Sequence, residues 1–191
     1  AGTQMGRVAS IKNVYVGGNA GYYATGSYNV FMGYEAGKGG TTSAPYSSGE
    51  SNVAVGFEAL KAFTTGGSNT AIGYQAIPYA TTPNNIVALG YRAGYNLSTG
   101  QANVFIGANA GNQLTTDQYV TAVGYNAGYY SEGAIGNKYN SYFGATAGYR
   151  GGPGIHQTYI GNSAGLYATA SFNTFVGSDA GKGGTTSAPY S

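Results

Sequence analysis

The chain has 191 residues, among them 35 glycines and 20 tyrosines, but no cysteine, no tryptophan, one histidine and only 7% charged residues. Abundant aromatic residues and few charges exclude a disordered tail. Eight Lys and Arg residues and six Asp and Glu residues give a net charge of +2. The basic residues are scattered, so no nucleic-acid partner is predicted. No stretch approaches the roughly 20 apolar residues of a membrane span.

Residues 1–12 form a lead-in segment, after which the phrase Asn13-Val-Tyr-Val-Gly17 begins a repeat of ten copies. Each copy has one glycine at the end of this phrase, the repeat glycine, and an alanine three positions later, and successive repeat glycines are 16 to 23 residues apart. This period is too short for helix pairs and suits one turn, or coil, of a β-solenoid. The sequence therefore predicts an all-β fold, a parallel β-solenoid (β-roll) of about ten coils that forms one continuous domain over 13–191. The repeat glycines are Gly17, Gly33, Gly56, Gly73, Gly90, Gly107, Gly124, Gly144, Gly161 and Gly177, and the alanines are Ala20, Ala36, Ala59, Ala76, Ala93, Ala110, Ala127, Ala147, Ala164 and Ala180.

Each copy predicts one short strand, from about four residues before the repeat glycine to the glycine itself, paired in parallel with the next. The residue just before the glycine is always apolar, and the residue three before it is Val, Thr or Ser. Residues two apart on a strand share a face, so we expect these two columns to point inward.

The middle column, two residues before the repeat glycine, is never charged. A strand that is apolar on both faces should be covered on both, and a lone coil of this size buries little core. We therefore expect the aromatic members of this column to lie against another chain or a second layer of the same chain, and the chain to assemble with itself. These chain-contact candidates are Tyr15, Phe31, Phe105, Tyr142, Tyr159 and Phe175.

Asparagine stands four positions before the repeat glycine in seven of the ten copies. Two compatible interpretations are open: asparagine favours turns and caps nearby amides, or the side chains form a ladder in which each amide bonds the next. The residues are Asn13, Asn29, Asn52, Asn69, Asn103, Asn140 and Asn173.

A longer period overlies the coils, because residues 36–47 return unchanged as residues 180–191, displaced by 144 residues or eight coils. A solenoid normally ends in a cap that covers its open core, and none is visible here. We therefore expect the array to be part of a longer chain and to continue beyond Ser191 in the register of this super-repeat.

Segments such as Asn52-Val-Ala-Val-Gly-Phe-Glu-Ala and Asn69-Thr-Ala-Ile-Gly-Tyr-Gln-Ala resemble the head repeats of trimeric autotransporter adhesins and the related repeats of phage tail fibres. The resemblance covers nearly all of 13–191. It implies a left-handed parallel β-roll of three chains, exposed on a cell or virion surface and used for attachment. The coils of 16–23 residues are longer than those of adhesin heads, and aromatics replace the usual small middle residue in six copies.

No catalytic, cofactor or metal site is predicted. His156 is interpreted as a solvated loop residue, because the chain has no cysteine and Asp117 and Asp179 belong to separate coils. The Gly-Lys-Gly-Gly-Thr-Thr-Ser runs at 37–43 and 181–187 lack the order of a phosphate loop. Calcium turns of the glycine-aspartate type would need an aspartate in every repeat.

Aromatic residues also recur after the repeat glycine, at Tyr34, Phe57, Tyr74, Tyr91 and Tyr125, and after the next Ala-Gly pair, at Tyr22, Tyr95, Tyr129 and Tyr149. Stacked at strand spacing they would form ladders that stiffen the structure, or else platforms for sugar rings; the structural role is favoured. Asn96-Leu97-Ser98 is an N-glycosylation sequon, and O-linked sugars on Thr41, Thr42, Ser43 and their copies Thr185, Thr186 and Ser187 are a weaker suggestion.

The leading hypothesis is a non-enzymatic structural or adhesive subunit of an extracellular fibre, whose partners are copies of itself and, in addition, surface glycans or a host receptor. The alternative is a phage tail-fibre shaft or receptor-binding protein. A soluble polysaccharide- or ice-binding solenoid is the third possibility, and it would need a flat exposed array of threonines. Thr70, Thr121, Thr158 and Thr174 are expected in an inward column, which disfavours it.

Overall fold

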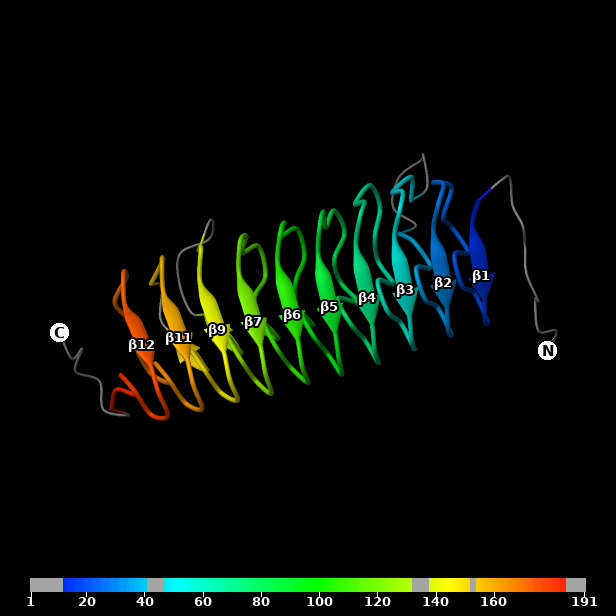
Figure 1. Ribbon diagram of the computed structural model, residues 1–191. Helices are drawn as coiled ribbons and strands as arrows, with labels where there is room; N and C mark the ends of the chain where they lie inside the picture. The colour runs from blue at the N-terminus through cyan, green and yellow to red at the C-terminus, as the bar shows by residue number, and fades with distance from the viewer. Residues whose placement is uncertain (1–11, 41–46, 132–137, 152–153, 185–191) are drawn as a thin grey trace.

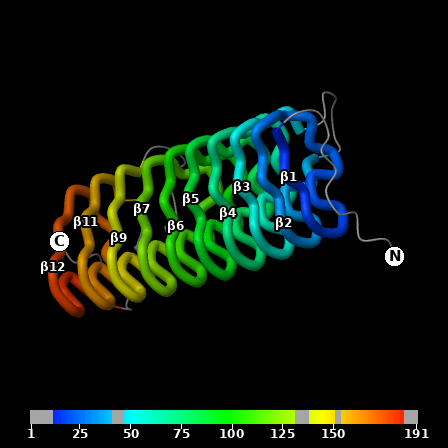
Figure 2. The backbone as a smooth tube through the Cα atoms, turned by 45° about the vertical axis from the view of Figure 1, so that its right-hand side comes forward, coloured from blue at the N-terminus to red at the C-terminus, as the bar shows by residue number. Residues whose placement is uncertain are grey.

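The computed structural model describes residues 12–40, 47–131, 138–151 and 154–184 as a parallel β-solenoid. Ten short strands form one sheet in chain order, and the coils stack along a single axis with β1 and β12 at opposite ends of the stack (Figures 1 and 2). The strands are β1 (Val14–Val16), β2 (Val30–Met32), β3 (Val53–Val55), β4 (Thr70–Ile72), β5 (Val87–Leu89), β6 (Val104–Ile106), β7 (Thr121–Val123), β9 (Ser141–Phe143), β11 (Thr158–Ile160) and β12 (Thr174–Val176). A second, two-stranded parallel sheet pairs β8 (Tyr130–Ser131) with β10 (Arg150–Gly151).

The predicted parallel pairing is confirmed, and the register never slips. Val14, Tyr15 and Val16 face Val30, Phe31 and Met32, and the same alignment holds along the sheet. The strands have three residues, fewer than expected, because the backbone turns away at both ends. The repeat glycines have φ between 124° and 135°, and the residue five positions before each of them also has a positive φ.

The repeat glycines are required by the spacing of the coils as well as by φ. A Cβ atom built on Gly73 would lie 2.4 Å from the carbonyl oxygen of Gly90 in the next coil, and the other repeat glycines before Gly177 are equally crowded. Only a residue without a side chain lets two coils approach so closely. The alanines three positions later are small and mostly buried, as predicted.

The direction of the strand side chains differs from the prediction. The middle residue of each strand points into the coil, and the residues on either side of it point outward. Phe31, Phe105 and Tyr159 are completely buried within a single chain. The expected inward columns are therefore wrong. Of the two alternatives for the six aromatic residues, packing against another layer of the same chain is the one observed: Tyr15, Phe31, Phe105, Tyr142 and Tyr159 are core residues, and Phe175 packs against that core from the last coil described.

These aromatic residues fit inside the coil because a glycine faces each of them from the opposite wall. The nearest atom of the Phe31 ring lies only 2.4 Å from the position that a Cβ atom on Gly37 would occupy. In the next two coils the middle residues are Ala54 and Ala71, and the positions equivalent to Gly37 hold Leu60 and Ile77, both fully buried. A large residue on one wall thus meets a small one on the other, which keeps the core densely packed.

The asparagine ladder is present, although most of its bonds join side chain to backbone. The Asn29 carboxamide oxygen accepts from the Asn52 backbone N–H at 2.8 Å, and its nitrogen donates to the Gly49 carbonyl at 3.0 Å. Within the described coils, only Asn69 also bonds the asparagine side chain of the preceding coil, donating to the Asn52 carboxamide oxygen at 2.8 Å. Each buried asparagine therefore links its coil to the next one, so both interpretations of the column were correct in part.

Several sequence-based expectations fall outside the described residues. They are the lead-in before Lys12, the suggested O-linked sites at 41–43 and 185–187, and the continuation of the array beyond Ser191. Among the residues that are described, no helix has the length and apolarity to cross a membrane.

Candidate interaction surface

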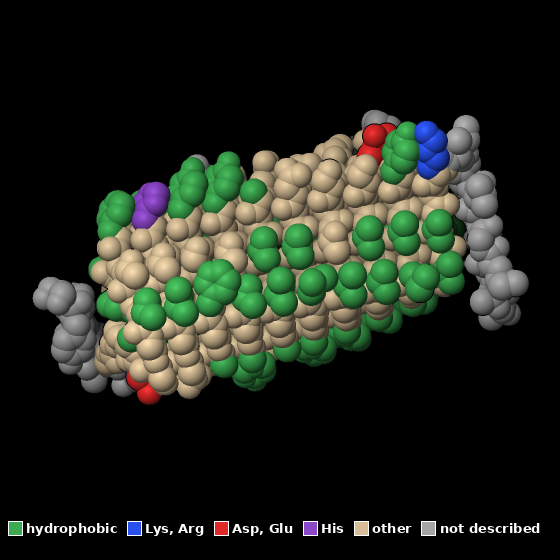
Figure 3. Space-filling view, in the orientation of Figure 1, with side chains coloured by type: hydrophobic (Ala, Val, Ile, Leu, Met, Phe, Trp, Pro, Cys, Tyr) green, Lys and Arg blue, Asp and Glu red, His purple; other side chains and the backbone are tan. Residues whose placement is uncertain are grey.

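The outward side of the ten-stranded sheet carries two uncharged columns, which together we call the outer face. One column is the third residue of each strand and is entirely apolar; the other is the first residue and contains Val, Thr or Ser. The third-residue column forms a green row along the whole solenoid, whereas the first-residue column is green only where it holds valine, mainly toward β1 (Figure 3). Ile72 is 41% exposed and Phe143 41%, and neither column contains a charge.

The outward side of the sheet, with its two edges included, is large. With about 4.8 Å between strands and 3.3 Å between residues, ten coils and the seven residues from edge to edge cover about 45 Å by 20 Å. This is about 900 Å², close to one partner's share of a standard protein interface. A surface of this size with an uncharged centre is suited to association.

The threonines of the third hypothesis lie on this outer face, contrary to the inward placement that was expected. Thr70, Thr121 and Thr158 are half-buried first residues of their strands, and Thr174 is exposed at the end of the stack. Thr70 has valines on both sides in its column, whereas from β7 to β12 the column consists of Thr121, Ser141, Thr158 and Thr174. A column of larger apolar side chains adjoins them, so no threonine array extends over the whole face.

The trailing edge of the outer face, defined as the residue after each repeat glycine, carries the predicted aromatic ladder. The rings of Tyr34, Phe57, Tyr74 and Tyr91 stack in sequence with centroids 5.5, 5.2 and 5.4 Å apart. Because neighbouring rings cover each other's faces, the inner rings have no open face for a sugar. The ladder arrangement is confirmed for these four residues, and its geometry favours the structural role. Tyr125 stands apart from the stack, because Ala108 occupies the equivalent position in the coil between Tyr91 and Tyr125.

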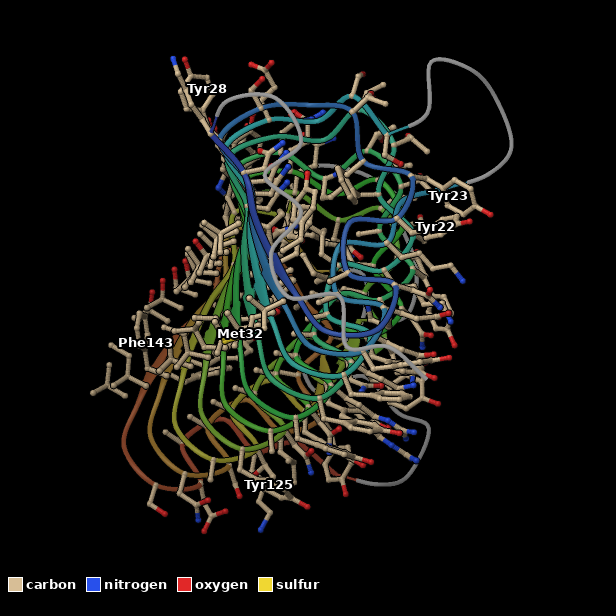
Figure 4. All side chains as sticks on the ribbon, turned by 90° about the vertical axis from the view of Figure 1, so that its right-hand side faces the viewer. Tyr22, Tyr23, Tyr28, Met32, Tyr125 and Phe143 are labelled. Carbon is tan, nitrogen blue, oxygen red and sulfur yellow. The ribbon has the colours of Figure 1, made fainter. Side chains whose placement is uncertain are left out.

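The second set of tyrosines is less regular. Tyr129 and Tyr149 stack at 5.2 Å, whereas Tyr95 meets Tyr79 edge-on and shares a 3.0 Å hydroxyl contact with it. Tyr22 lies edge-on to Tyr23 on the side of the coil away from the outer face (Figure 4). These residues therefore form local pairs.

The leading edge, defined as the residue five positions before each repeat glycine, carries a second ladder, which sequence reasoning missed. Tyr119, Tyr139, His156 and Phe172 stack at 4.9, 5.0 and 5.1 Å with nearly parallel rings. His156 is exposed, as expected of a loop histidine, but it is one member of this stack. The signal was available, because the four residues occupy the same position in consecutive copies.

A charged network lies in the coils of β2 and β3, beginning at the second residue after Gly33 and Gly56. The Lys61 Nζ atom lies 2.8 Å from Glu35 Oε2 and 2.7 Å from Glu58 Oε1, and Lys38 approaches Glu35 at 2.6 Å. Partial burial by itself raises the pKa of both carboxyl groups, but the hydrogen bonds from the lysines outweigh it, so both pKa values are lowered. The same hydrogen bonds raise the pKa of Lys61.

We predict that Lys61→Met lowers stability at neutral pH and much less in acid. A carboxyl group whose pKa is lower in the folded chain stabilises it above the unfolded pKa of about 4.3, and this contribution disappears as the pH falls through the folded pKa. We expect a loss of about 1 kcal/mol at pH 7, since the network is partly exposed. Urea unfolding at pH 7 and pH 3 measures the difference. Lys182→Met, which removes the exposed Lys182–Asp179 pair, is the control and should show little change at either pH.

One ion pair in the described part of the chain is buried. Lys138 is completely inaccessible, and its Nζ lies 3.6 Å from Asp117 Oδ1. Burial raises the pKa of the Asp117 carboxyl, and the nearby Lys138 opposes this shift. Asp117 therefore stabilises the fold most at low pH, opposite in sign to Glu35 and Glu58. Among the described residues no three His, Asp or Glu side chains gather into a possible metal site.

The glycosylation sequon at Asn96 lies on the wall away from the sheet. Its side-chain nitrogen, where a sugar would be attached, donates a 2.7 Å hydrogen bond to Gln113 in the next coil.

Comparison with known proteins identifies no relative of this chain: no protein-family model, no curated protein and no solved structure matches it.

Proposed function

We propose that this chain is a non-enzymatic structural subunit of an extracellular fibre, in which copies associate side by side, as a trimer, through the outer face. The observation that carries the proposal is the exposed apolar column that continues without a charge over all ten strands of the sheet. An isolated chain would leave this surface in water, whereas a second copy supplies a matching face of equal length.

Three further features support a fibre. The coils stack in one direction without slippage, each coil is tied to its neighbour by hydrogen bonds along the axis, and aromatic ladders reinforce both edges of the face. The resemblance of the repeat to adhesin heads and phage tail fibres is the basis for placing the fibre on a cell or virion surface. A tail-fibre shaft has the same physical requirements and is included in the proposal, with surface glycans or a host receptor as the ligands of the assembled fibre.

The test is the mass of the assembly in solution. We expect the parent chain to sediment as an oligomer at micromolar concentration and Ile106→Asp to sediment as a folded monomer, because an unpaired carboxylate would be placed in an apolar contact. Ile106 points outward and is 36% exposed in the single chain, so the fold should tolerate the change.

The matched control is Tyr22→Asp, which puts the same charge on a side chain that is 62% exposed and lies away from the outer face. It should leave the oligomer unchanged. A monomeric parent chain would overturn the proposal. If that monomer bound ice or a polysaccharide in a pull-down, the third hypothesis would replace it.

A further inference from the structure

Lys138 is buried at a position that is open to solvent in the other described coils. It stands six residues before the repeat glycine Gly144, and at the equivalent position of every other described copy the residue is partly or fully exposed. A lysine close to a protein surface normally extends its ammonium group into water. The Lys138 side chain is instead completely inaccessible. The fold therefore removes this one amine from water.

The carboxyl group of Asp117, in the preceding coil, lies beside this amine. Lys138 Nζ is 3.6 Å from Asp117 Oδ1, and Asp117 is itself only 5% exposed. Asp117 stands seven residues before the repeat glycine Gly124, where the other described copies have Gly, Pro or Ala. Two exceptions to the repeat thus lie in adjacent coils and face each other.

As a salt bridge, this pair is poorly built. A buried ion pair is stable when short hydrogen bonds offset the loss of water from both charges, and such bonds are about 2.7–2.9 Å long. An ammonium group has three hydrogens to donate, yet Lys138 Nζ forms no hydrogen bond with any described residue. Lys38 and Glu35, which are partly exposed, approach at 2.6 Å. Charge attraction alone therefore does not explain why Lys138 and Asp117 are buried together.

The arrangement does suit the condensation of an amine with a carboxylic acid. Proton transfer within the pair converts the ammonium and the carboxylate into a neutral amine and a neutral acid, and burial favours neutral groups; it raises the pKa of Asp117 accordingly. The Thr115 backbone N–H donates to Asp117 Oδ2 at 3.3 Å, which leaves Oδ1 as the oxygen beside Nζ. The distance from Nζ to the carboxyl group is close to the 3–3.5 Å of groups poised to react.

We propose that Lys138 and Asp117 form an intramolecular isopeptide bond, an amide between Lys138 Nζ and Asp117 Cγ. The neutral amine attacks Cγ, and the Thr115 N–H stabilises the negative charge that develops on Oδ2. The bond from Cγ to Oδ1 then breaks, and Oδ1 leaves with its own hydrogen and one proton from the amine as a water molecule. The step needs no oxidant and no cofactor. It goes beyond the proposed fibre function, because it joins two coils covalently in a chain that has no cysteine for a disulfide.

Intact mass spectrometry of the purified, folded chain tests the bond, and trypsin locates it. We expect most chains to weigh about 18 Da, one water molecule, less than the 19.4 kDa sequence. Trypsin cuts after an unmodified lysine, so a linked Lys138 should yield one uncut peptide, 93–150, that carries the whole deficit. A folded chain of full mass, or normal cleavage after Lys138, overturns the proposal.

Two variants complete the test. Asp117→Ala removes the acid and should restore both the full mass and the cleavage after Lys138. The matched control, Asp179→Ala, removes the carboxyl group of the exposed Lys182–Asp179 pair and should keep the deficit. A deficit that persists in Asp117→Ala assigns the loss of water to another site and overturns the proposal.

The result is independent of assembly and of how well Asp117→Ala folds. The digest of the parent chain locates the bond without any variant, and the bond lies within one chain. A parent chain of full mass that sediments as an oligomer overturns the isopeptide bond and leaves the proposed association intact. A monomeric parent chain that lacks the water molecule does the reverse.

Discussion

Gly73→Ala is expected to destabilise the solenoid by about 3 kcal/mol or more. Its φ of +135° is a conformation that alanine adopts only under strain, and the new methyl group would lie 2.4 Å from the carbonyl oxygen of Gly90. The contact is between two backbones, so no side chain can move aside, and relief requires separating the coils and weakening the hydrogen bonds between them. Urea unfolding followed by circular dichroism measures the loss.

The matched control is Gly177→Ala in the 191-residue chain. Gly177 has a similar φ of +124°, but among the described residues only the Ala180 methyl group comes within range of a Cβ there, at 3.9 Å. This variant suffers the backbone strain without the collision, so it should cost no more than about 1–2 kcal/mol. Equal losses in the two variants would show that close approach of the coils is not what requires glycine.

Phe105→Asp is the second change with a large expected effect: the chain should lose its cooperative unfolding transition or be destabilised by several kcal/mol. The Phe105 ring is fully buried and packs against the positions of Gly94 and Gly111, so a carboxylate at this position would lose its contact with water. Thermal unfolding of the purified variant, beside the parent, measures the effect.

Ile106→Asp places the same carboxylate one residue further along the strand, on the opposite side of the sheet. We expect that variant to keep its β-sheet circular dichroism while its oligomer dissociates. The two neighbouring substitutions thus separate folding from assembly. If Ile106→Asp unfolded the chain and Phe105→Asp did not, the assignment of inner and outer columns would be reversed.

The sequence was sufficient to predict the solenoid, its parallel register and one strand in each copy, because these depend on the repeated glycine and alanine alone. It was also sufficient to predict the ladder Tyr34 to Tyr91, since equivalent positions stack wherever coils align without slippage. These features depend on the number of residues between equivalent positions of successive copies, and that number can be read directly from the sequence.

The side of the sheet that faces inward was not predicted correctly, because both sides of these strands are apolar. The polarity of the side chains therefore could not show which side faces inward, whereas their sizes could have done so. Phe31 accompanies Gly37, while Ala54 accompanies Leu60, and such an exchange is expected only between residues that share a core. The column before the repeat glycine stays apolar without any such partner, as suits a surface that is covered from outside.

The coils differ in length, yet the sheet keeps one register, and the coil between β2 and β3 shows how. Gly40 donates its backbone N–H to the Ser47 hydroxyl at 2.9 Å, and that hydroxyl donates to the Phe63 carbonyl at 2.7 Å. Gly40 and Ser47, which flank 41–46, are therefore bonded to each other, and Ser47 is bonded to the next coil. Inserted sequence at such a junction adds little closure entropy. The position could host a foreign peptide, displayed once per super-repeat at intervals of about 38 Å along an extended array.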